Sequence, residues 1–312
     1  MKKPLVGAVF TALLLGATAI PAAAVSNDAP TSDKRAAAAQ PAAAAQKSTA
    51  KSDVKTKAVT FAGTVALSNC SGSVVRVPNS QPTDPALVLS NGHCLETGFP
   101  GPGQVIVDRP STRSFTLLNA SGGNAGTVRA SKIAYGTMTD TDVSLYQLTS
   151  TYRDIESRYG IKALDLDAAH PQAGRAITVA SGYWKRMYKC SVDGFAYRLK
   201  EGRWTWKDSL RYTQPCQVIG GTSGSPVIDD ATGKVVAVNN TINEDGQRCT
   251  DNNPCEVDQN GNVTVRPHIG YAQQTYIVAA CVGTGNKIDL NRPGCTLPKP
   301  AAAAKPRVPA VR

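Results

Sequence analysis

The stretch GGTSGSPVID, residues 220–229, joins a run of glycine, serine and threonine directly to apolar residues. Gly221 and Gly224 flank Ser223, and glycine adopts backbone conformations that a Cβ would resist. Pro226 then fixes φ at the start of an apolar segment that is typical of a strand. The stretch is either an ordinary surface turn or a backbone shaped to present one serine, and only the rest of the chain can supply partners for that serine.

Short, Val-rich runs fill most of the chain on either side of this stretch, and Gly, Pro, Asn, Asp and Ser separate them. Many such strands with few helices favour an all-β sandwich or barrel. The main helix candidate is TSTYRDIESRYGI, from about residue 152 to 159, near the middle, where a link between two halves would fall. A second, shorter candidate is YIVAACVGTG near the C-terminus.

The two ends of the chain differ from this pattern. Residues 1–24 start with Lys2 and Lys3, continue with an apolar run and end in three alanines, which predicts a signal peptide, with a retained anchor as the alternative. Residues 25–57 are low in complexity and predict a propeptide or linker, and residues 298–312 form a basic Pro/Ala tail. We expect both segments to be disordered and the folded domain to span residues 58–297.

The formal charge of +11 on 312 residues is concentrated at these ends, which argues against a specific nucleic-acid reader. A hydrophobic content of 41% and a charged content of 18% suit a soluble globular protein, and no later segment resembles a membrane span.

Eight cysteines fit an exported chain with up to four disulfides. Eight cysteines allow 105 pairings, of which sequential pairing is the simplest. A zinc site is the alternative, but the chain has no Cys-x-x-Cys, so no metal and no cofactor are expected. The cysteines are Cys70, Cys94, Cys190, Cys216, Cys249, Cys255, Cys281 and Cys295.

A serine nucleophile needs a general base, and the base needs a carboxylate to orient it. His93 follows an apolar run and a small-residue turn in ALVLSNGHCLE, beside Cys94. Asp142 opens the apolar run of TDTDVSLYQL, and we prefer it to Asp140 because Asp140 lies deeper in the polar turn. Taken alone, each of these residues could have a purely structural role. However, His93, Asp142 and Ser223 are all predicted at junctions between a strand and a turn, and this combination favours a shared catalytic role.

These segments resemble the motifs of chymotrypsin-like (trypsin-fold) serine proteases over roughly residues 59–285. NCSGSVV and LVLSNGHC resemble the Cys-Gly-Gly-Ser strand and the Ala-Ala-His-Cys box, and DVSLYQL resembles the Asp-Ile-Ala-Leu-Leu run. AGRAITVASGYW is similar to the Gly…Val-Ser-Gly-Trp segment. GTSGSPV resembles the Gly-Asp-Ser-Gly-Gly-Pro box, closest to the Gly-x-Ser-Gly-Ser-Pro form of bacterial glutamyl-endopeptidase-like members.

The resemblance implies an all-β fold of two packed six-stranded antiparallel barrels, with His93 and Asp142 from the first barrel and Ser223 from the second. It also implies a Cys70–Cys94 disulfide. By restricting the unfolded chain, this disulfide should stabilise the fold by roughly 3 kcal/mol. Sequential pairing remains our expectation for the other six cysteines.

Two further predictions concern how the site treats a substrate. The backbone N–H groups of Gly221 and Ser223 are candidates for an oxyanion hole. By the resemblance, Gln217 would lie at the base of the S1 pocket, with Asn239, Asn240 and Thr241 in its wall. Gln217 disfavours an Arg or Lys preference, and the absence of a histidine at Asn239 or Asn240 puts glutamate specificity in doubt.

At position 222 this chain has a threonine. Many animal members of the family carry an aspartate at this position, and it pairs with a newly cut N-terminus. We therefore expect no activation by that insertion. Of the remaining histidines, His170 is expected in a surface loop and His268 in a structural role.

The sequence thus predicts a secreted, monomeric serine endopeptidase acting on protein or peptide substrates. Two alternatives stay open: an inactive relative used as a surface- or protein-binding module, and a structural exported β protein.

Overall fold

The structure, a computed structural model, describes residues 58–214 and 216–301. The predicted signal peptide, the propeptide or linker, and most of the basic tail lie outside the described residues. No helix in the described ranges has the length and apolarity needed to cross a membrane.

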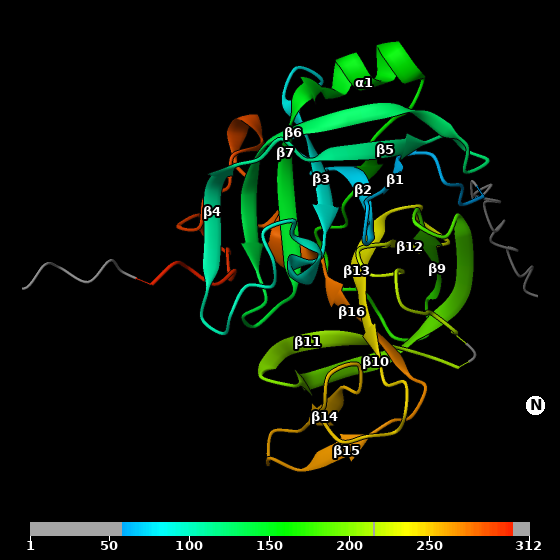
Figure 1. Ribbon diagram of the computed structural model, residues 1–312, viewed down its shortest axis with the longest axis vertical. Helices are drawn as coiled ribbons and strands as arrows, with labels where there is room; N and C mark the ends of the chain where they lie inside the picture. Colours follow the sequence, from blue (N-terminus) through cyan, green and yellow to red (C-terminus); the bar gives the residue numbers. More distant parts are fainter. Residues whose placement is uncertain (1–57, 215, 302–312) are drawn as a thin grey trace, which may run out of the picture. The chain divides into compact units, whose positions relative to one another are not determined.

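The first half of the described chain forms a closed antiparallel barrel in the order β1-β5-β6-β7-β3-β2, which the β1–β2 pairing completes (Figure 1). β4 also pairs with β6, and β8 adds a short parallel pairing to β2. The strands are β1 (Thr64–Ala66), β2 (Ser71–Arg76), β3 (Pro85–Ser90), β4 (Val105–Pro110), β5 (Ser114–Leu118), β6 (Asn124–Thr137), β7 (Val143–Thr151) and β8 (Leu164–Asp165).

The second half repeats this plan in the order β11-β16-β13-β12-β9-β10, and the β10–β11 pairing closes it. β14 and β15 extend the sheet from β10. The strands are β9 (Ala176–Ser181), β10 (Arg186–Glu201), β11 (Trp204–Tyr212), β12 (Pro226–Asp229), β13 (Val235–Ile242), β14 (Cys255–Val257), β15 (Val263–Val265) and β16 (Gly270–Gln274). The predicted all-β fold of two six-stranded barrels is confirmed.

Two helices fall where the sequence placed them. α1 (Tyr152–Tyr159) begins at a capping box between Thr151 and Asp154 and ends at Gly160, which is left-handed with φ of 66°. It follows the first barrel and precedes the second. α2 (Tyr276–Ala279) lies near the C-terminus, and two short 3₁₀ turns, η1 (Gly92–Cys94) and η2 (Thr284–Asn286), complete the structure.

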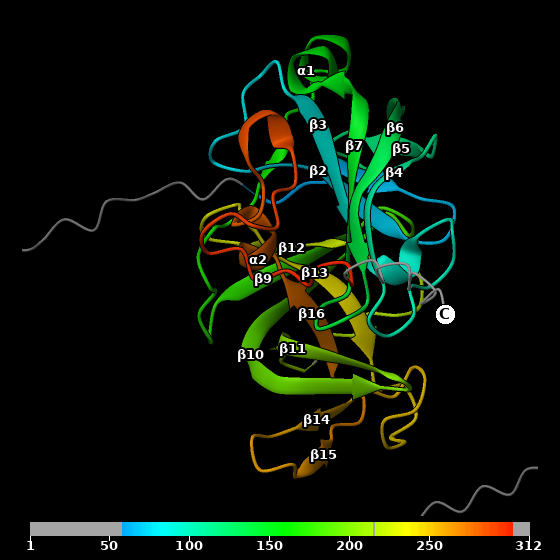
Figure 2. The same cartoon turned by 90° about the vertical axis from the view of Figure 1, so that its left-hand side faces the viewer.

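The alternation of side chains along β3 and β7 packs the two barrels together. Val88 and Tyr146 point into the core of the first barrel. Leu87 and Leu145, one residue earlier on each strand, point outward into a second apolar cluster. That cluster also holds Ile228, Val235 and Val238 of the second barrel together with Val278 and Val282 of the C-terminal segment. Figure 2 shows this orange-to-red segment beside β3 and β7.

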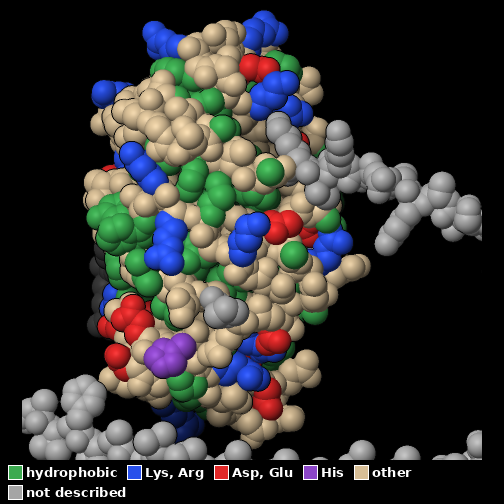
Figure 3. All heavy atoms as spheres, turned by 90° about the vertical axis from the view of Figure 1, so that its right-hand side faces the viewer, with side chains coloured by type: hydrophobic (Ala, Val, Ile, Leu, Met, Phe, Trp, Pro, Cys, Tyr) green, Lys and Arg blue, Asp and Glu red, His purple; other side chains and the backbone are tan. Residues whose placement is uncertain are grey.

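Lys and Arg side chains on the surface are dispersed among acidic ones on the face that Figure 3 shows, and they form no continuous stripe there. The first residues of the predicted tail are described and packed. The Pro298 carbonyl accepts a hydrogen bond from the Tyr135 hydroxyl (2.9 Å), and Lys299 Nζ donates to Asn291 Oδ1 (2.8 Å).

All four disulfides join sequential cysteines, as expected. They are Cys70–Cys94, Cys190–Cys216, Cys249–Cys255 and Cys281–Cys295.

Candidate active site

His93 lies in η1, immediately after β3, and two features fix its backbone. The neighbouring Cys94 is bonded to Cys70 next to β2. Gly92 is packed so tightly that an added Cβ would lie 2.1 Å from the Thr137 carbonyl oxygen, so this turn requires glycine. The two sulfurs lie within 4.8 Å of a ring nitrogen of His93, but as a disulfide they cannot serve as thiolate metal ligands.

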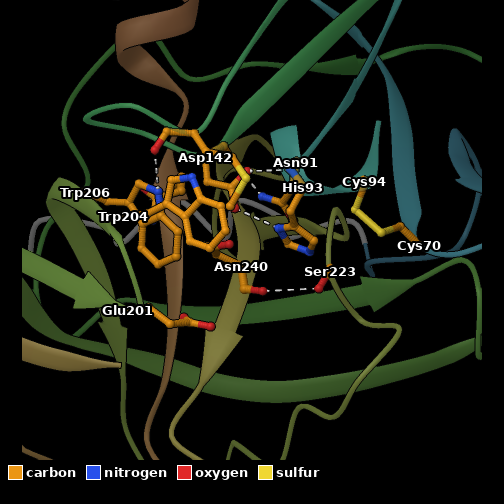
Figure 4. Close-up of polar contacts among 12 residues, drawn as sticks. Cys70, Asn91, His93, Cys94, Asp142, Glu201, Trp204, Trp206, Ser223 and Asn240 are labelled. Atoms are coloured by element: carbon orange, nitrogen blue, oxygen red, sulfur yellow. Dashed lines mark hydrogen bonds and ion pairs between the residues drawn. A yellow bond between two sulfur atoms is a disulfide. The ribbon is translucent and has the colours of Figure 1, made fainter. Parts of the chain in front are cut away.

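Asp142 is fully buried at the start of β7, and its carboxylate faces His93 (Figure 4). Oδ2 lies 2.7 Å from His93 Nδ1, and Oδ1 accepts a hydrogen bond from the His93 backbone N–H (3.0 Å). The Asn91 side chain donates to the Asp142 carbonyl (2.8 Å), which ties the two segments together. Asp140 instead pairs with Lys207, its Oδ2 lying 2.7 Å from the Nζ.

Ser223 lies between two left-handed glycines, Gly221 with φ of 85° and Gly224 with φ of 79°. A Cβ on Gly224 would lie 2.0 Å from the Ser71 carbonyl oxygen of the first barrel. The Ser71 N–H donates to the Ser223 carbonyl (2.8 Å), so the two barrels hold this turn between them. The Ser223 hydroxyl donates to the Asn240 carbonyl (3.2 Å), and Figure 4 shows the free edge of the His93 ring pointing toward Ser223.

The peptide group between Gly220 and Gly221 is held by Trp184, whose indole N–H donates to the Gly220 carbonyl (2.7 Å). In a planar trans peptide the N–H points opposite to the C=O, so the Gly221 N–H points away from Trp184. Among the described residues, none accepts a hydrogen bond from the N–H of Gly221 or Ser223. Both donors are therefore free for another acceptor.

Thr222 is buried, and its hydroxyl finds one partner in its own loop and one on β13. Its hydroxyl donates to the Ile219 carbonyl and accepts from the Asn239 side chain (3.1 Å). The Asn239 side chain also accepts from the Tyr212 hydroxyl (3.0 Å), so both of its polar atoms are used inside the protein.

One cavity of about 420 Å³ brings His93, Asp142 and Ser223 together. Asn239, Asn240 and Thr241 of β13 also line it. Gln217 is exposed and is not among its lining residues. The cavity also has walls that were not predicted from the sequence, namely Phe99 and the β10–β11 hairpin with Glu201, Trp204 and Trp206.

His170 and His268 lie outside this cavity. His170 pairs with Asp208 (3.1 Å) and packs against the rings of Phe195 and Tyr276. His268 occupies a turn with φ of 62° and donates its N–H to the Asn243 carbonyl (2.8 Å).

The electrostatics of the cavity favour a basic imidazole. Burial alone would lower the pKa of His93, but the charge and hydrogen bond of Asp142, together with the charge of Glu201, raise that pKa above its ordinary value. At neutral pH a raised pKa makes the ring a stronger proton acceptor.

Comparison with known proteins identifies the domain. A sequence model of the family described as "trypsin-like peptidase domain" matches residues 70–238, more than half of the chain. The chain belongs to this family. The match runs from β2 of the first barrel into β13 of the second barrel of this trypsin-like peptidase. It includes all three residues of the His93, Asp142 and Ser223 group.

Solved structures similar to this trypsin-like peptidase are remote in sequence. The protease domain of MamO from Magnetospirillum magneticum is 14% identical, covers 70% of this chain and 95% of its own, and has a TM-score of 0.43. The active form of the Rv3671c protease from M. tuberculosis is 15% identical, covers 77% and 84%, and has a TM-score of 0.44. A search of curated proteins found no significant match.

Proposed function

We propose that this trypsin-like peptidase is a secreted, monomeric serine endopeptidase that cleaves peptide bonds through an acyl-enzyme. The observation that carries the proposal is the contact of buried Asp142 with His93 in the same cavity as Ser223. His93 acts as general base, Asp142 holds its tautomer and Ser223 is the nucleophile.

The chemistry starts with a change of partner for the Ser223 hydroxyl. When substrate binds, the hydroxyl leaves the Asn240 carbonyl and donates to Nε2 of His93, since catalytic hydrogen bonds often form only in the complex. Nε2 takes the proton as Oγ attacks the scissile carbonyl carbon. The N–H groups of Gly221 and Ser223 stabilise the oxyanion, and His93 then protonates the leaving amine. Water, activated by the same imidazole, hydrolyses the ester on Ser223.

The remaining assignments follow the same proposal. Residues 1–24 act as the signal peptide, residues 25–57 as a propeptide or linker, and the trypsin-like domain begins at residue 58. Four disulfides suit an oxidising compartment outside the cytosol.

A fluorophosphonate probe tests the function. We expect the folded wild-type protein to be labelled at Ser223 and the Ser223→Ala variant to remain unlabelled. A well-folded wild-type chain, freed of residues 1–57, that takes up no label would favour the inactive binding module instead.

Trp184 is predicted to be a positioning residue for the oxyanion hole. Trp184→Phe removes the indole donor to the Gly220 carbonyl, so the 220–221 peptide can turn its N–H out of the hole. Loss of one donor lowers kcat by about 10²–10³. We expect a partial effect here, with kcat about tenfold lower and KM little changed. Steady-state kinetics against Tyr183→Phe, an exposed aromatic neighbour, measure it, and a change confined to KM would contradict the role.

Activity is predicted not to depend on one particular free N-terminus. Thr222 carries no charge and its hydroxyl already has two partners, so the loop offers no carboxylate to a new ammonium group. Mature chains that start at different residues between 53 and 58 should have kcat values within about twofold of one another. A sharp optimum at a single start residue, measured under identical conditions, would refute this.

A further inference from the structure

The wall of the cavity beyond His93 is aromatic. Phe99 is 59% exposed, and its ring centroid lies 5.8 Å from that of His93 and 5.9 Å from that of Trp204. The indole N–H groups of Trp204 and Trp206 donate to the carbonyls of Pro100 (2.9 Å) and Met138 (3.1 Å). Figure 4 shows both indoles on the Asp142 side of the site. Because their N–H groups are used, these rings offer the cavity their π faces and edges.

Of the described residues, four carboxylates and no basic side chain apart from His93 line the cavity directly. Glu201, Glu244 and Asp251 line the cavity in addition to Asp142, and no Lys or Arg is among the described lining residues. We call the region formed by Phe99, Glu201, Trp204, Trp206, Asn240, Glu244 and Asp251 the acidic pocket. A low-dielectric wall with several carboxylates attracts a cation strongly.

Glu201 is the buried member of this group. Its Oε1 accepts the Asn252 N–H (2.9 Å), whereas its Oε2 is buried without a hydrogen-bond partner. Burial raises the pKa of Glu201, and the hydrogen bond from Asn252 and the charge of His93 only partly oppose this rise. The loop that carries Asp251 is fixed by the Cys249–Cys255 disulfide and packs on Gly202, where an added Cβ would lie 2.2 Å from Asp251 Oδ1.

Asn240 supplies an independent sign of a missing ligand. Its side chain is 3% exposed and lines the cavity, yet neither Oδ1 nor Nδ2 has a partner. Buried polar atoms without partners are rare, and each one costs about 1–3 kcal/mol unless water or a ligand satisfies it. Two unpaired oxygens, Asn240 Oδ1 and Glu201 Oε2, thus await hydrogen-bond donors in one cavity.

We propose that the acidic pocket binds the cationic side chain of a lysine or arginine close to the scissile bond of the substrate. This inference rests on the proposed peptidase function. An ammonium or guanidinium group satisfies both unpaired oxygens by donating hydrogen bonds and gains cation–π contact with the indoles. Arg203 already lies over the Trp204 ring (4.9 Å), so this indole accepts a guanidinium as a neighbour.

The proposal changes the specificity expected from the sequence. Gln217 argued against an Arg or Lys preference because it replaces an acidic residue. In the structure the carboxylates come instead from the end of β10 and from the loop after β13.

Paired fluorogenic peptides test the proposal. The two peptides of a pair differ at a single position near the cleaved bond. One peptide carries lysine or arginine there, and the other carries the neutral analogue, norleucine or citrulline. A separate pair is made for each position. At one position we expect kcat/KM to be about tenfold to a hundredfold higher for the cationic member. Glu201→Gln should reduce this ratio about tenfold while the neutral substrate reports any general damage. Glu156→Gln in α1, an exposed residue outside the cavity, is the matched control and should keep the ratio.

Two results would overturn the inference: a ratio near one at every position in the wild type, or a ratio unchanged by Glu201→Gln. Fluorophosphonate labelling separates these from failure of the proposed function, because the probe needs only the nucleophile and its base. If Glu201→Gln does not fold, Glu244→Gln at the exposed rim of the pocket takes its place. We then expect a smaller, few-fold drop in the ratio of kcat/KM between the cationic and the neutral substrate. An unchanged ratio would again count against the acidic pocket.

Discussion

Ser223→Ala is expected to lower kcat on a peptide substrate by about 10⁶-fold, because no other hydroxyl can replace the nucleophile in the acyl-transfer step. The fold should survive. The hydroxyl makes one hydrogen bond, to the Asn240 carbonyl, and its removal leaves the left-handed glycines on either side unchanged. The free energy of unfolding should change by less than about 1 kcal/mol.

Hydrolysis of a saturating peptide substrate, followed over days for the variant, measures the drop. Ser131→Ala, an exposed serine on β6, is the matched control and should keep full activity. A small residual rate is compatible with the mechanism, because binding and the oxyanion hole still accelerate attack by water. Near-normal activity in Ser223→Ala would show that the nucleophile lies elsewhere.

The positions of the three site residues were accessible from the sequence because each one lies within three residues of the end of a strand. Apolar alternation places β3 before His93 and β7 after Asp142, and the glycines around Ser223 mark a turn that other residues resist. Antiparallel pairing of β3 with β7, in which Ser90 lies opposite Ser144, then brings the first two residues together. This long-range register is what a single sequence does not display.

The acidic pocket was not predicted, and the reason lies in the β10–β11 hairpin. β10 carries charged and polar residues along most of its length, and a register shift between Val192 and Gly194 interrupts its alternation. The apolar pattern therefore stays too weak to mark a strand. A signal was present in the Trp-x-Trp pattern of Trp204 and Trp206 after the Gly202 turn, since alternate aromatic residues share one face of a strand.

The exposed position of Gln217 has a similar explanation. Counting back from the nucleophile assumes that the intervening loop keeps the family's path. Here Val218 and Ile219 line the cavity, and Gln217 faces solvent. A loop position carried over by spacing alone is less secure than one fixed by strand pairing.

Asp142→Asn is expected to lower kcat by about 10⁴-fold, and the hydrogen bonds explain why. The backbone N–H of His93 donates to Oδ1, so an asparagine would keep its carbonyl oxygen there and turn its NH₂ group toward Nδ1. Nδ1 would then have to accept, which moves the ring proton to Nε2. An Nε2–H cannot accept the Ser223 proton, so the general base is lost while the fold remains.

The pH profile of the same variant separates this role from simple damage. In the wild type the raised pKa of His93 puts the acid limb of kcat/KM above the ordinary histidine value of 6.5, because the neutral ring is the active form. Asp142→Asn removes the negative charge that raises this pKa most, while burial, which lowers the pKa, remains. The acid limb of the variant should therefore move to lower pH, and its maximal rate should fall. Asp140→Asn, whose carboxylate pairs with Lys207, is the control and should leave both the rate and the limb in place. If Asp140→Asn abolished activity and Asp142→Asn spared it, the carboxylate that orients His93 would have been assigned to the wrong residue.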